Sequence, residues 1–400
     1  MSRALQDVVV LDVTASFWAS FGAALLADAG ARVIRVEDLS HPQPDGAFFA
    51  SESWPQLYEL ANRNKVSVAL QLASDAGRKV FEQLVAKADV VVTDALQPEL
   101  AEQGLDYETL VRLKADLVYA HGSGFGPEGP DRDLPALDEL AAARTGMMPI
   151  LPQPGQPPVY TGSGQMYSTI MLAFGVMLAL WHRVEKGEGQ QVDASLFAGN
   201  MYGASLDLQA FLAMGGDRFL HPVARLDAGN PMSGTLYPTL DGLWVTLTMP
   251  DTDRWWPQLA EITGLDAQDE RFDSHEKRCE ANRLLLIELL EQAFQRQPAA
   301  RWRTLFSERQ LSADVIEDYA FPVQDEQVFR NRFILDVEHP ARGAFRTLGF
   351  PLFMSDSPHR LQRTAPLRGQ HTAELLSDLL DYDEDDIVRL EAGGMVGGRR

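Results

Sequence analysis

Cysteine is almost absent from this chain of 400 residues. The one cysteine, Cys279, directly follows the polar, charged stretch 275–278. A single thiol cannot form a disulfide within the chain, so the sequence favours a reducing compartment, and we expect a cytoplasmic protein. Cys279 itself is interpreted as incidental to function.

Positive charge is also scarce. Lysine and arginine number 35 against 57 aspartates and glutamates, which gives a formal net charge of -22 and a pI near 4.7. Because phosphates would be repelled, this balance argues against broad binding to nucleic acid or to an anionic membrane. It leaves room for one local basic pocket.

Long hydrophobic runs are missing as well. The longest, Met166 to Trp181, is shorter than the roughly 20 residues that cross a bilayer, and it includes Ser168 and Thr169. We interpret it as a fully buried helix and not as a membrane span. The first residues show no charged-then-apolar leader, so no secretion signal is expected.

The composition is that of a soluble globular protein, with 45% hydrophobic and 23% charged residues. Short β-branched runs alternate with helical patterns in the first third. The expected strands are Val8–Leu11, Val33–Val36, Val90–Val92 and Leu117–His121; the expected helices are Phe17–Ala29, Ala76–Ala86 and Tyr107–Leu113. This alternation predicts a parallel sheet covered by helices, a Rossmann-like α/β core.

The glycine-rich segment Gly122–Pro130 is not a dinucleotide-binding loop by our interpretation. Pro127 and Pro130 remove backbone donors and prevent an immediate helix, so no helix N-terminus faces a pyrophosphate.

The middle of the chain changes pattern. Tyr237–Val245 carries a hairpin signal with Asp241-Gly242 at the turn. Further helices are expected at Asn200–Met214, Trp255–Thr263, Arg283–Phe294, Ala299–Arg309, His371–Leu380 and Asp385–Leu390. The region around the hairpin therefore predicts a smaller α+β domain, followed by a return to the first domain.

Short motifs spread over the whole length resemble one family. They are Leu11-Asp-Val-Thr14, Leu25–Ala31, Val33–Glu37, Asn64-Lys65, Ala88–Val91, Gly122–Pro130, His182-Arg183, Gly187–Gln190, Val192-Asp193, Tyr237 with Asp241-Gly242, Val337–Pro340 and Ala365–His371. In this order and spacing they are similar to the family III CoA-transferases, which include formyl-CoA transferase, carnitine CoA-transferase and α-methylacyl-CoA racemase.

The resemblance implies an architecture. A large Rossmann-like domain is built from both chain ends, a small α+β domain is inserted, and two subunits interlock in a dimer. The expected bounds are 1–224 and 323–392 for the large domain, 225–322 for the small one and 393–400 for a disordered tail.

The resemblance also implies the chemistry, which departs from the family at one position. In the family an aspartate attacks the thioester of an acyl-CoA and holds the acyl group covalently. Counting back from Gln190, the matching residue is Gln165, and no aspartate or glutamate occurs between Pro149 and Arg183. The substrate would be a coenzyme A thioester, with no covalently bound cofactor and no metal.

Three interpretations of Gln165 stay open. The nucleophile has been lost and the amide caps the helix; or Gln165 or Ser163 has a new chemical role; or the nucleophile comes from elsewhere, such as Asp138 or Glu139.

The positions that match the family's CoA pocket are degenerate. Asp38 stands where a basic residue often follows the second strand, Asp94 replaces an asparagine, and Glu102 replaces an arginine. Such acids repel a polyphosphate. The other pocket positions are Phe17, Trp18 and Leu70, with Met166 and Tyr167 expected against the acid substrate. The racemase branch also needs a histidine near Leu137, which is missing.

These features predict a subunit of a CoA-transferase that moves CoA from an acyl-CoA donor to an aromatic or succinate-type acid. It would lack its own nucleophile and act beside a homologous catalytic subunit, as in benzylsuccinate CoA-transferase. The alternatives are a non-catalytic binding or structural protein on the same fold, and an active homodimer with an unusual nucleophile.

Overall fold

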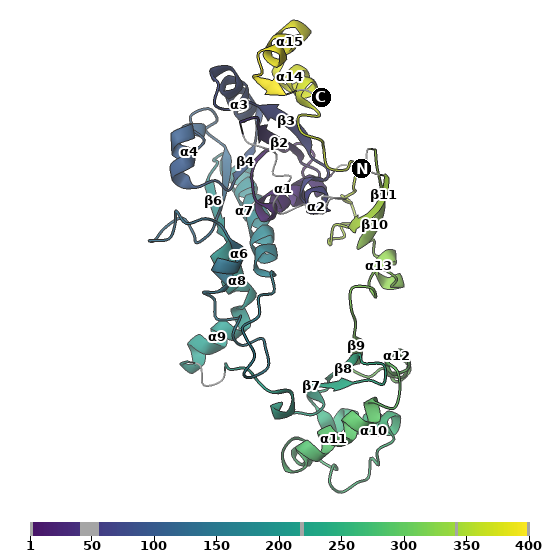
Figure 1. Ribbon diagram of the computed structural model, residues 1–400. Helices are drawn as coiled ribbons and strands as arrows, with labels where there is room; N and C mark the ends of the chain where they lie inside the picture. Colours follow the sequence, from purple (N-terminus) through teal and green to yellow (C-terminus); the bar gives the residue numbers. More distant parts are fainter. Residues whose placement is uncertain (1–2, 41–55, 217–219, 341–342, 398–400) are drawn as a thin grey trace. The chain divides into compact units, whose positions relative to one another are not determined.

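The computed structural model describes residues 3–40, 56–216, 220–340 and 343–397 (Figure 1). Contacts between residues divide the chain into two compact units. The large unit comprises Met1–Met148, Tyr160–Ala213 and Phe329–Arg400, and the small unit comprises Pro149–Val159 and Met214–Val328. Both ends of the chain thus belong to the large unit.

A seven-stranded sheet forms the centre of the large unit, in the order β12-β3-β2-β1-β4-β5-β6. Its strands are β1 (Val9–Val13), β2 (Arg32–Asp38), β3 (Val66–Leu70), β4 (Val90–Thr93), β5 (Val118–Ser123), β6 (Gln191–Ser195) and β12 (Val396–Gly397). All neighbours are parallel except β12, which pairs antiparallel with β3. The inner strands are β-branched and buried on both faces, as parallel strands require.

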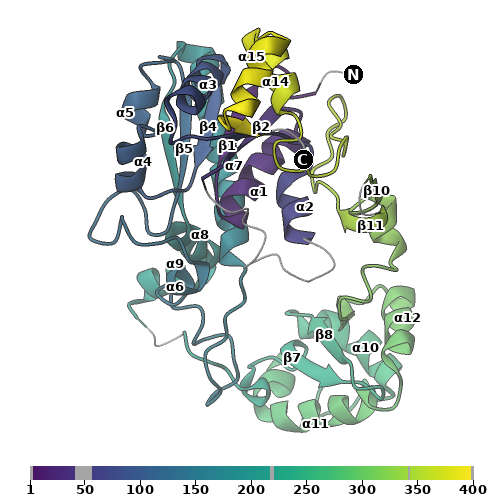
Figure 2. The same ribbon diagram turned by 45° about the horizontal axis from the view of Figure 1, so that its top comes forward.

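Helices cover both faces of this sheet (Figure 2). The core on one face includes α1 and α7, and the core on the other includes α3, α14 and α15. The helices of the large unit are α1 (Phe17–Asp28), α2 (Gln56–Asn62), α3 (Asp75–Lys87), α4 (Gln97–Gln103), α5 (Tyr107–Leu110), α6 (Asp138–Ala142), α7 (Gly164–Lys186), α8 (Leu196–Gly203), α9 (Ser205–Met214), α14 (Thr372–Leu380) and α15 (Glu384–Ala392). The α/β class with a large parallel sheet is therefore confirmed.

One helix and two strands connect the small unit back to the C-terminal helices. Helix α13 (Glu326–Arg330) spans the division between the units, and the strands β10 (Ile334–His339) and β11 (Gly343–Leu348) form an antiparallel hairpin in the large unit. The C-terminal helices then return to the N-terminal strands, since α14 packs against β3 and α3 (Figures 1 and 2).

The small unit joins a three-stranded antiparallel sheet to three helices. Its elements are a 3-10 turn (Arg225–Asp227), β7 (Ser233–Pro238), β8 (Trp244–Thr248), α10 (Thr252–Thr263), a π turn (Lys277–Ala281), α11 (Arg283–Phe294), α12 (Ala299–Arg309) and β9 (Ala313–Ile316). The hairpin turns at Asp241-Gly242, where Gly242 has a φ of 82°. An aromatic cluster around Phe294, which contacts Tyr237, Trp302 and Phe306, fills its core.

The structure corrects the interpretation of the apolar run as a fully buried helix. α7 buries one face against α1 and the sheet, but Ile170, Phe174, Leu178 and Trp181 are each more than half exposed. The run is apolar all round, so its sequence could not show that only one face packs within the chain. By length and composition alone, α7 is also the one helix in the described part of the chain that could cross a membrane.

Three smaller expectations also needed correction. β3 was missing from the predicted strands. Asn200–Met214 is two helices, α8 and α9, and not one. The tail from Gly393 is ordered as far as Gly397, because Val396 and Gly397 pair with Leu70 and Ala69 at the open edge of β3. Residues 398–400 lie outside the described residues.

A buried ionic network ties the first strands to α1. The Lys65 ammonium lies 2.6 Å from the Asp12 carboxylate and donates to the Ser20 carbonyl at 2.7 Å, and both charged side chains are fully buried. Burial opposes ionisation of Asp12, but Lys65 and Arg35 outweigh it and hold the pKa of Asp12 below 3.8. Burial lowers the pKa of Lys65 to about 8, so both groups are charged at pH 7.

We expect Lys65→Met to lower the free energy of unfolding by about 3 kcal/mol, because it leaves the Asp12 charge buried with weaker compensation. Urea unfolding monitored by circular dichroism measures the change. Lys79→Met, at an exposed position of α3, is the matched control and should change the free energy by less than about 0.5 kcal/mol.

The same variants have a pH dependence of defined sign. The stabilisation from ionised Asp12 is present above its ordinary pKa of 3.8 and is lost as the pH falls through its lower folded value. The gap between the wild type and Lys65→Met should therefore narrow below about pH 4. A gap that is small at pH 7, or constant with pH, would contradict the role of the network.

Candidate functional site

A cavity of about 590 Å³ opens at the carboxyl ends of β1, β2 and β4. Its walls come from the last residues of these strands and the segments after them, 13–16, 35–38 and 93–96, with further residues from α4, from 135–136 and from Arg368. β1 lies between β2 and β4 in the sheet. Strands β2 and β3 are added on one side of β1 and β4 to β6 on the other, so the strand order changes direction at this point. Such a switch point is where open α/β sheets bind ligands.

Asp94 occupies the anion-binding position of this cavity. Its Oδ1 accepts a hydrogen bond from the Ala15 N–H and its Oδ2 accepts one from the Ser16 N–H, both at 2.7 Å. Ser16 is the N-cap of α1 and Ala15 precedes it, so both donors lie beside the positive end of that helix. Burial raises the pKa of Asp94, and the hydrogen bonds from Ser16 and Ala15 oppose the rise. A carboxylate of the chain thus takes the donors that a bound phosphate would use.

The remaining charges in the cavity are mostly acidic. Glu37, Asp38 and Glu99 line it beside Asp94. Two guanidinium groups also line the cavity, but both are engaged. Arg35 lies 3.5 Å from Asp12 and 3.7 Å from Glu37, and Arg368 donates to the Asp38 carbonyl at 2.5 Å. Four carboxylates against two arginines disfavour a ligand with several phosphates.

Only some of the pocket residues that the sequence predicted line this cavity. Asp38 and Asp94 line the cavity, whereas Phe17, Trp18, Leu70 and Glu102 do not. Trp18 is buried in the core, and its ring lies so close to Gly122 that a Cβ there would meet it at 2.8 Å, so the ring packs inside the large unit and not in the cavity.

Leu70 is likewise a core residue of β3, and Phe17 is half-buried at the start of α1. Glu102 is exposed on α4, and the acid of that helix in the cavity is Glu99, one turn earlier. The family resemblance pointed to Glu102 and missed Glu99, although the helical period of α4 places the two residues on the same face of the helix.

His121 fixes the loop that carries Asp94. Its Nδ1 lies 2.7 Å from Asp193 and its Nε2 lies 2.9 Å from the Ala95 carbonyl oxygen, so both ring nitrogens face acceptors. A doubly protonated ring can satisfy both. Burial lowers the pKa of His121, but the hydrogen bonds to Asp193 and Ala95 outweigh it and raise the pKa above 6.5.

Because the pKa of folded His121 is raised, its stabilising contribution is complete below pH 6.5 and is lost as the pH rises through the folded value. We therefore expect the difference in melting temperature between the wild type and His121→Gln to be larger at pH 5.5 than at pH 9. Thermal melts across this range measure the difference. Its independence of pH would contradict a protonated His121.

Gln165 lies in the first turn of α7, half-buried. The preceding Gly164 packs against the side chain of Asn200, and a Cβ on it would lie 1.9 Å from the Asn200 Oδ1. Asn200 Nδ2 in turn donates to Asp138 at 2.8 Å. The Asp138 carboxylate is thus separated from the start of α7 by one side-chain amide.

Tyr160 completes this cluster, whose members are Asp138, Tyr160, Gln165 and Asn200. Its hydroxyl donates to Asp138 Oδ2 at 2.6 Å. Burial, and then the contact with Asp138, raises the pKa of Tyr160 well above its usual value, so the phenol stays a donor. The amide of Gln165 and the hydroxyl of Tyr160 both lie within 4 Å of the Cβ position of Gly162, so both groups border the same small space.

The two expected substrate residues follow Gln165 on the same helix. Met166 is half-buried, and Tyr167 is 44% exposed with its ring packed over Gly203. His, Cys, Asp and Glu side chains do not gather into a group that could hold a metal within the described ranges.

Comparison with known proteins defines the family. The sequence model of the family described as "CoA-transferase family III" matches residues 5–372, so the chain belongs to this family. It is 29% identical to a cinnamoyl-CoA:phenyllactate CoA-transferase of Clostridium sporogenes, over 91% of this chain and 90% of the relative. It is 27% identical to an (R)-2-hydroxy-4-methylpentanoate CoA-transferase of Clostridioides difficile, over 98% and 99%.

The fold has solved counterparts. A CAIB/BAIF family protein from Brucella suis superimposes with a TM-score of 0.83 at 23% identity, covering 95% of this chain and all of that chain. At this identity the likeness shows the fold alone.

Proposed function

We propose that this chain is a subunit of a CoA-transferase that moves CoA between an acyl-CoA donor and a carboxylic acid, and that it acts beside a homologous catalytic subunit. Membership of family III supports the reaction class. The observation that supports the division of labour is the amide of Gln165 in the first turn of α7.

The chemistry explains why that amide matters. A carboxylate can attack the thioester carbonyl, form a C–O bond and release the CoA thiolate, which leaves a mixed anhydride on the protein. A neutral carboxamide is a far weaker nucleophile. The start of α7 offers no carboxylate of its own, because the sequence holds no acid from 149 to 183.

The acidic cavity supports the same proposal. With Asp94 on the N-terminus of α1 and three more carboxylates around it, the cavity is a poor host for the phosphates of CoA. The thioester would then bind to the sister subunit, and this chain would contribute its fold and part of the acid pocket.

The exposed face of α7 supports a protein partner. One face of α7 carries an apolar stripe that is exposed to solvent in the isolated chain and consists of Ile170, Phe174, Leu178 and Trp181. Continuous apolar surfaces of this kind are typical of interfaces between subunits. We propose an interlocked dimer with the sister chain, in the cytoplasm.

The acid would be bulky and apolar, or of the succinate type. Met166 and Tyr167 follow Gln165 on α7 and offer it apolar surface. The names of two relatives, which act on phenyllactate and on 2-hydroxy-4-methylpentanoate, support an acid with an aromatic or branched body. A third relative is named for succinyl-CoA and citramalate.

A second candidate function is an active homodimer in which Asp138 is the nucleophile. Its carboxylate lies near the start of α7 and accepts hydrogen bonds from Tyr160 and Asn200. These two donors would hold it in place, although they also reduce its nucleophilicity. A non-catalytic binding protein is the remaining alternative.

The purified chain alone, given succinyl-CoA and candidate acids, should show no CoA exchange above background in a chromatographic assay. Gln165→Asp should remain inactive, since the acidic cavity still disfavours the thioester. Adding a family III chain that has the aspartate should restore exchange.

Robust exchange by the single chain would contradict the division of labour. Asp138→Asn then separates the alternatives, because it removes activity if Asp138 is the nucleophile. Glu139→Gln tests the neighbouring acid in the same way, and Glu128→Gln, at an exposed acid with no assigned role, is the control that should keep full activity.

A further inference from the structure

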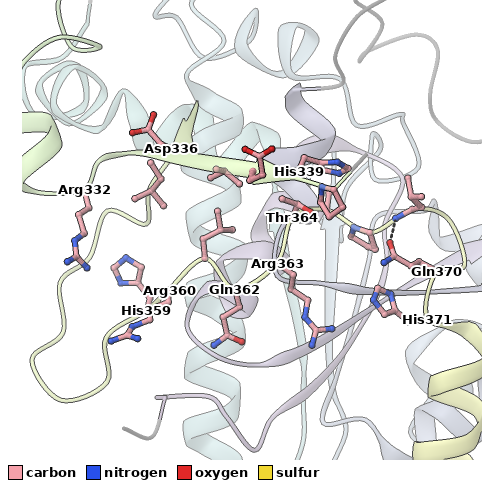
Figure 3. A pocket seen from close by; sticks show the side chains of 18 residues that line it. Arg332, Asp336, His339, His359, Arg360, Gln362, Arg363, Thr364, Gln370 and His371 are labelled. Atoms are coloured by element: carbon pink, nitrogen blue, oxygen red, sulfur yellow. Dashed lines mark hydrogen bonds between the residues drawn. The ribbon is translucent and has the colours of Figure 1, made fainter. Parts of the chain in front are cut away.

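A second cavity in the large unit, of about 720 Å³, has the opposite charge (Figure 3). Strand β10 and the segment 359–371 form its walls. Both cavities belong to the large unit, but they have no lining residue in common, so they are separate sites.

Three arginines line this basic cavity without a carboxylate partner. Among the described residues, no acid lies within ion-pair distance of the guanidinium groups of Arg332, Arg360 or Arg363, although arginines elsewhere in the chain are commonly paired. Figure 3 shows all three directed to the same side, with His359 and His371 among them.

The acids of this region do not neutralise these arginines. Asp336 points away from them in Figure 3, and its Oδ1 accepts a hydrogen bond from Arg346 at 3.0 Å. Glu338 also lines the cavity but lies in no ion pair with the three arginines. The local charge is therefore positive in a protein whose net charge is -22.

The three guanidinium groups are exposed to water, which screens their mutual repulsion, and they offer free hydrogen-bond donors on one side of the cavity. Guanidinium groups bind phosphate oxygens in bidentate fashion. Arg332 also has a φ of 56°, a conformation that non-glycine residues rarely adopt and that is enriched at binding sites.

The cavity has an apolar wall as well. Leu335, Val337, Leu361 and Leu367 line it together with the arginines. Its volume is in the range of sites for small organic molecules and exceeds the needs of a free inorganic ion. A suitable ligand combines a compact polyanionic group with an apolar or aromatic body.

We propose that this basic cavity binds an organic phosphate of the nucleoside diphosphate class. A nucleoside diphosphate gathers about three negative charges in one group, up to about two on the terminal phosphate and one on the inner phosphate, and can face three guanidinium groups at once. A carboxylate would bring a single charge. The site is independent of the function proposed above, and neither requires the other.

Isothermal titration of the full chain with ADP in about 50 mM salt tests the site. ADP should bind saturably and more tightly than inorganic pyrophosphate, because the base and ribose contact the apolar wall, and adenosine should not bind. Binding should weaken at about 200 mM salt. No saturable binding of ADP, or pyrophosphate binding as tightly as ADP, would overturn the proposal.

Variants assign the binding to this cavity. Arg360→Gln with Arg363→Gln should weaken ADP binding about 100-fold, since each charged hydrogen-bond donor is worth about tenfold. Gln362→Glu, which leaves the arginines in place, should also weaken it by adding a negative charge on the same side.

The charge-matched control replaces Arg112 and Arg301 with glutamine, two exposed arginines outside the cavity. It should bind ADP as the wild type does. An equal loss in both double variants would show that only the net charge matters and would refute the site. Circular dichroism melts verify that each variant is folded.

Discussion

The contact between Gly164 and Asn200 fixes the geometry of the site around the start of α7. A side chain at 164 would overlap the Asn200 amide, so only glycine lets α8 approach the first turn of α7 this closely. Asn200 then binds Asp138, which Tyr160 also contacts. One close approach therefore places an amide, a phenol and a carboxylate around a common space, with Gln165 where the family resemblance puts a nucleophile.

Two other features of the large unit bear on the function of this site, the acidic cavity and the apolar stripe on α7. The cavity at the switch point of the sheet presents Asp94 to the N-terminus of α1, so the chain already occupies its own anion site. The apolar stripe on α7 remains open to solvent in the single chain. An amide at the position of the family's nucleophile, together with an apolar stripe on α7, is what supports the proposed role as one subunit of a larger enzyme.

Much of the fold could be predicted from the sequence, because its signals are local. The β-branched runs at β1, β2, β4 and β5 and the hairpin at Asp241-Gly242 follow from periodicity and turn chemistry. The absence of an aspartate or glutamate between 149 and 183 is also visible in the sequence itself. Long-range contacts could not: no pattern shows that Trp18 packs under Gly122, that Val396 pairs with β3, or that only one face of α7 is buried. The three arginines of the basic cavity lie up to 31 positions apart in the sequence, and only the fold brings them together.

The central claim is that no side chain of this protein accepts the acyl group. The most direct measurement is intact-protein mass spectrometry after incubation with an acyl-CoA, followed by peptide mapping of any mass increase. The account predicts an unmodified chain, including the peptides that carry Gln165 and Asp138. A stoichiometric acyl or CoA adduct on a carboxylate of this chain would contradict it.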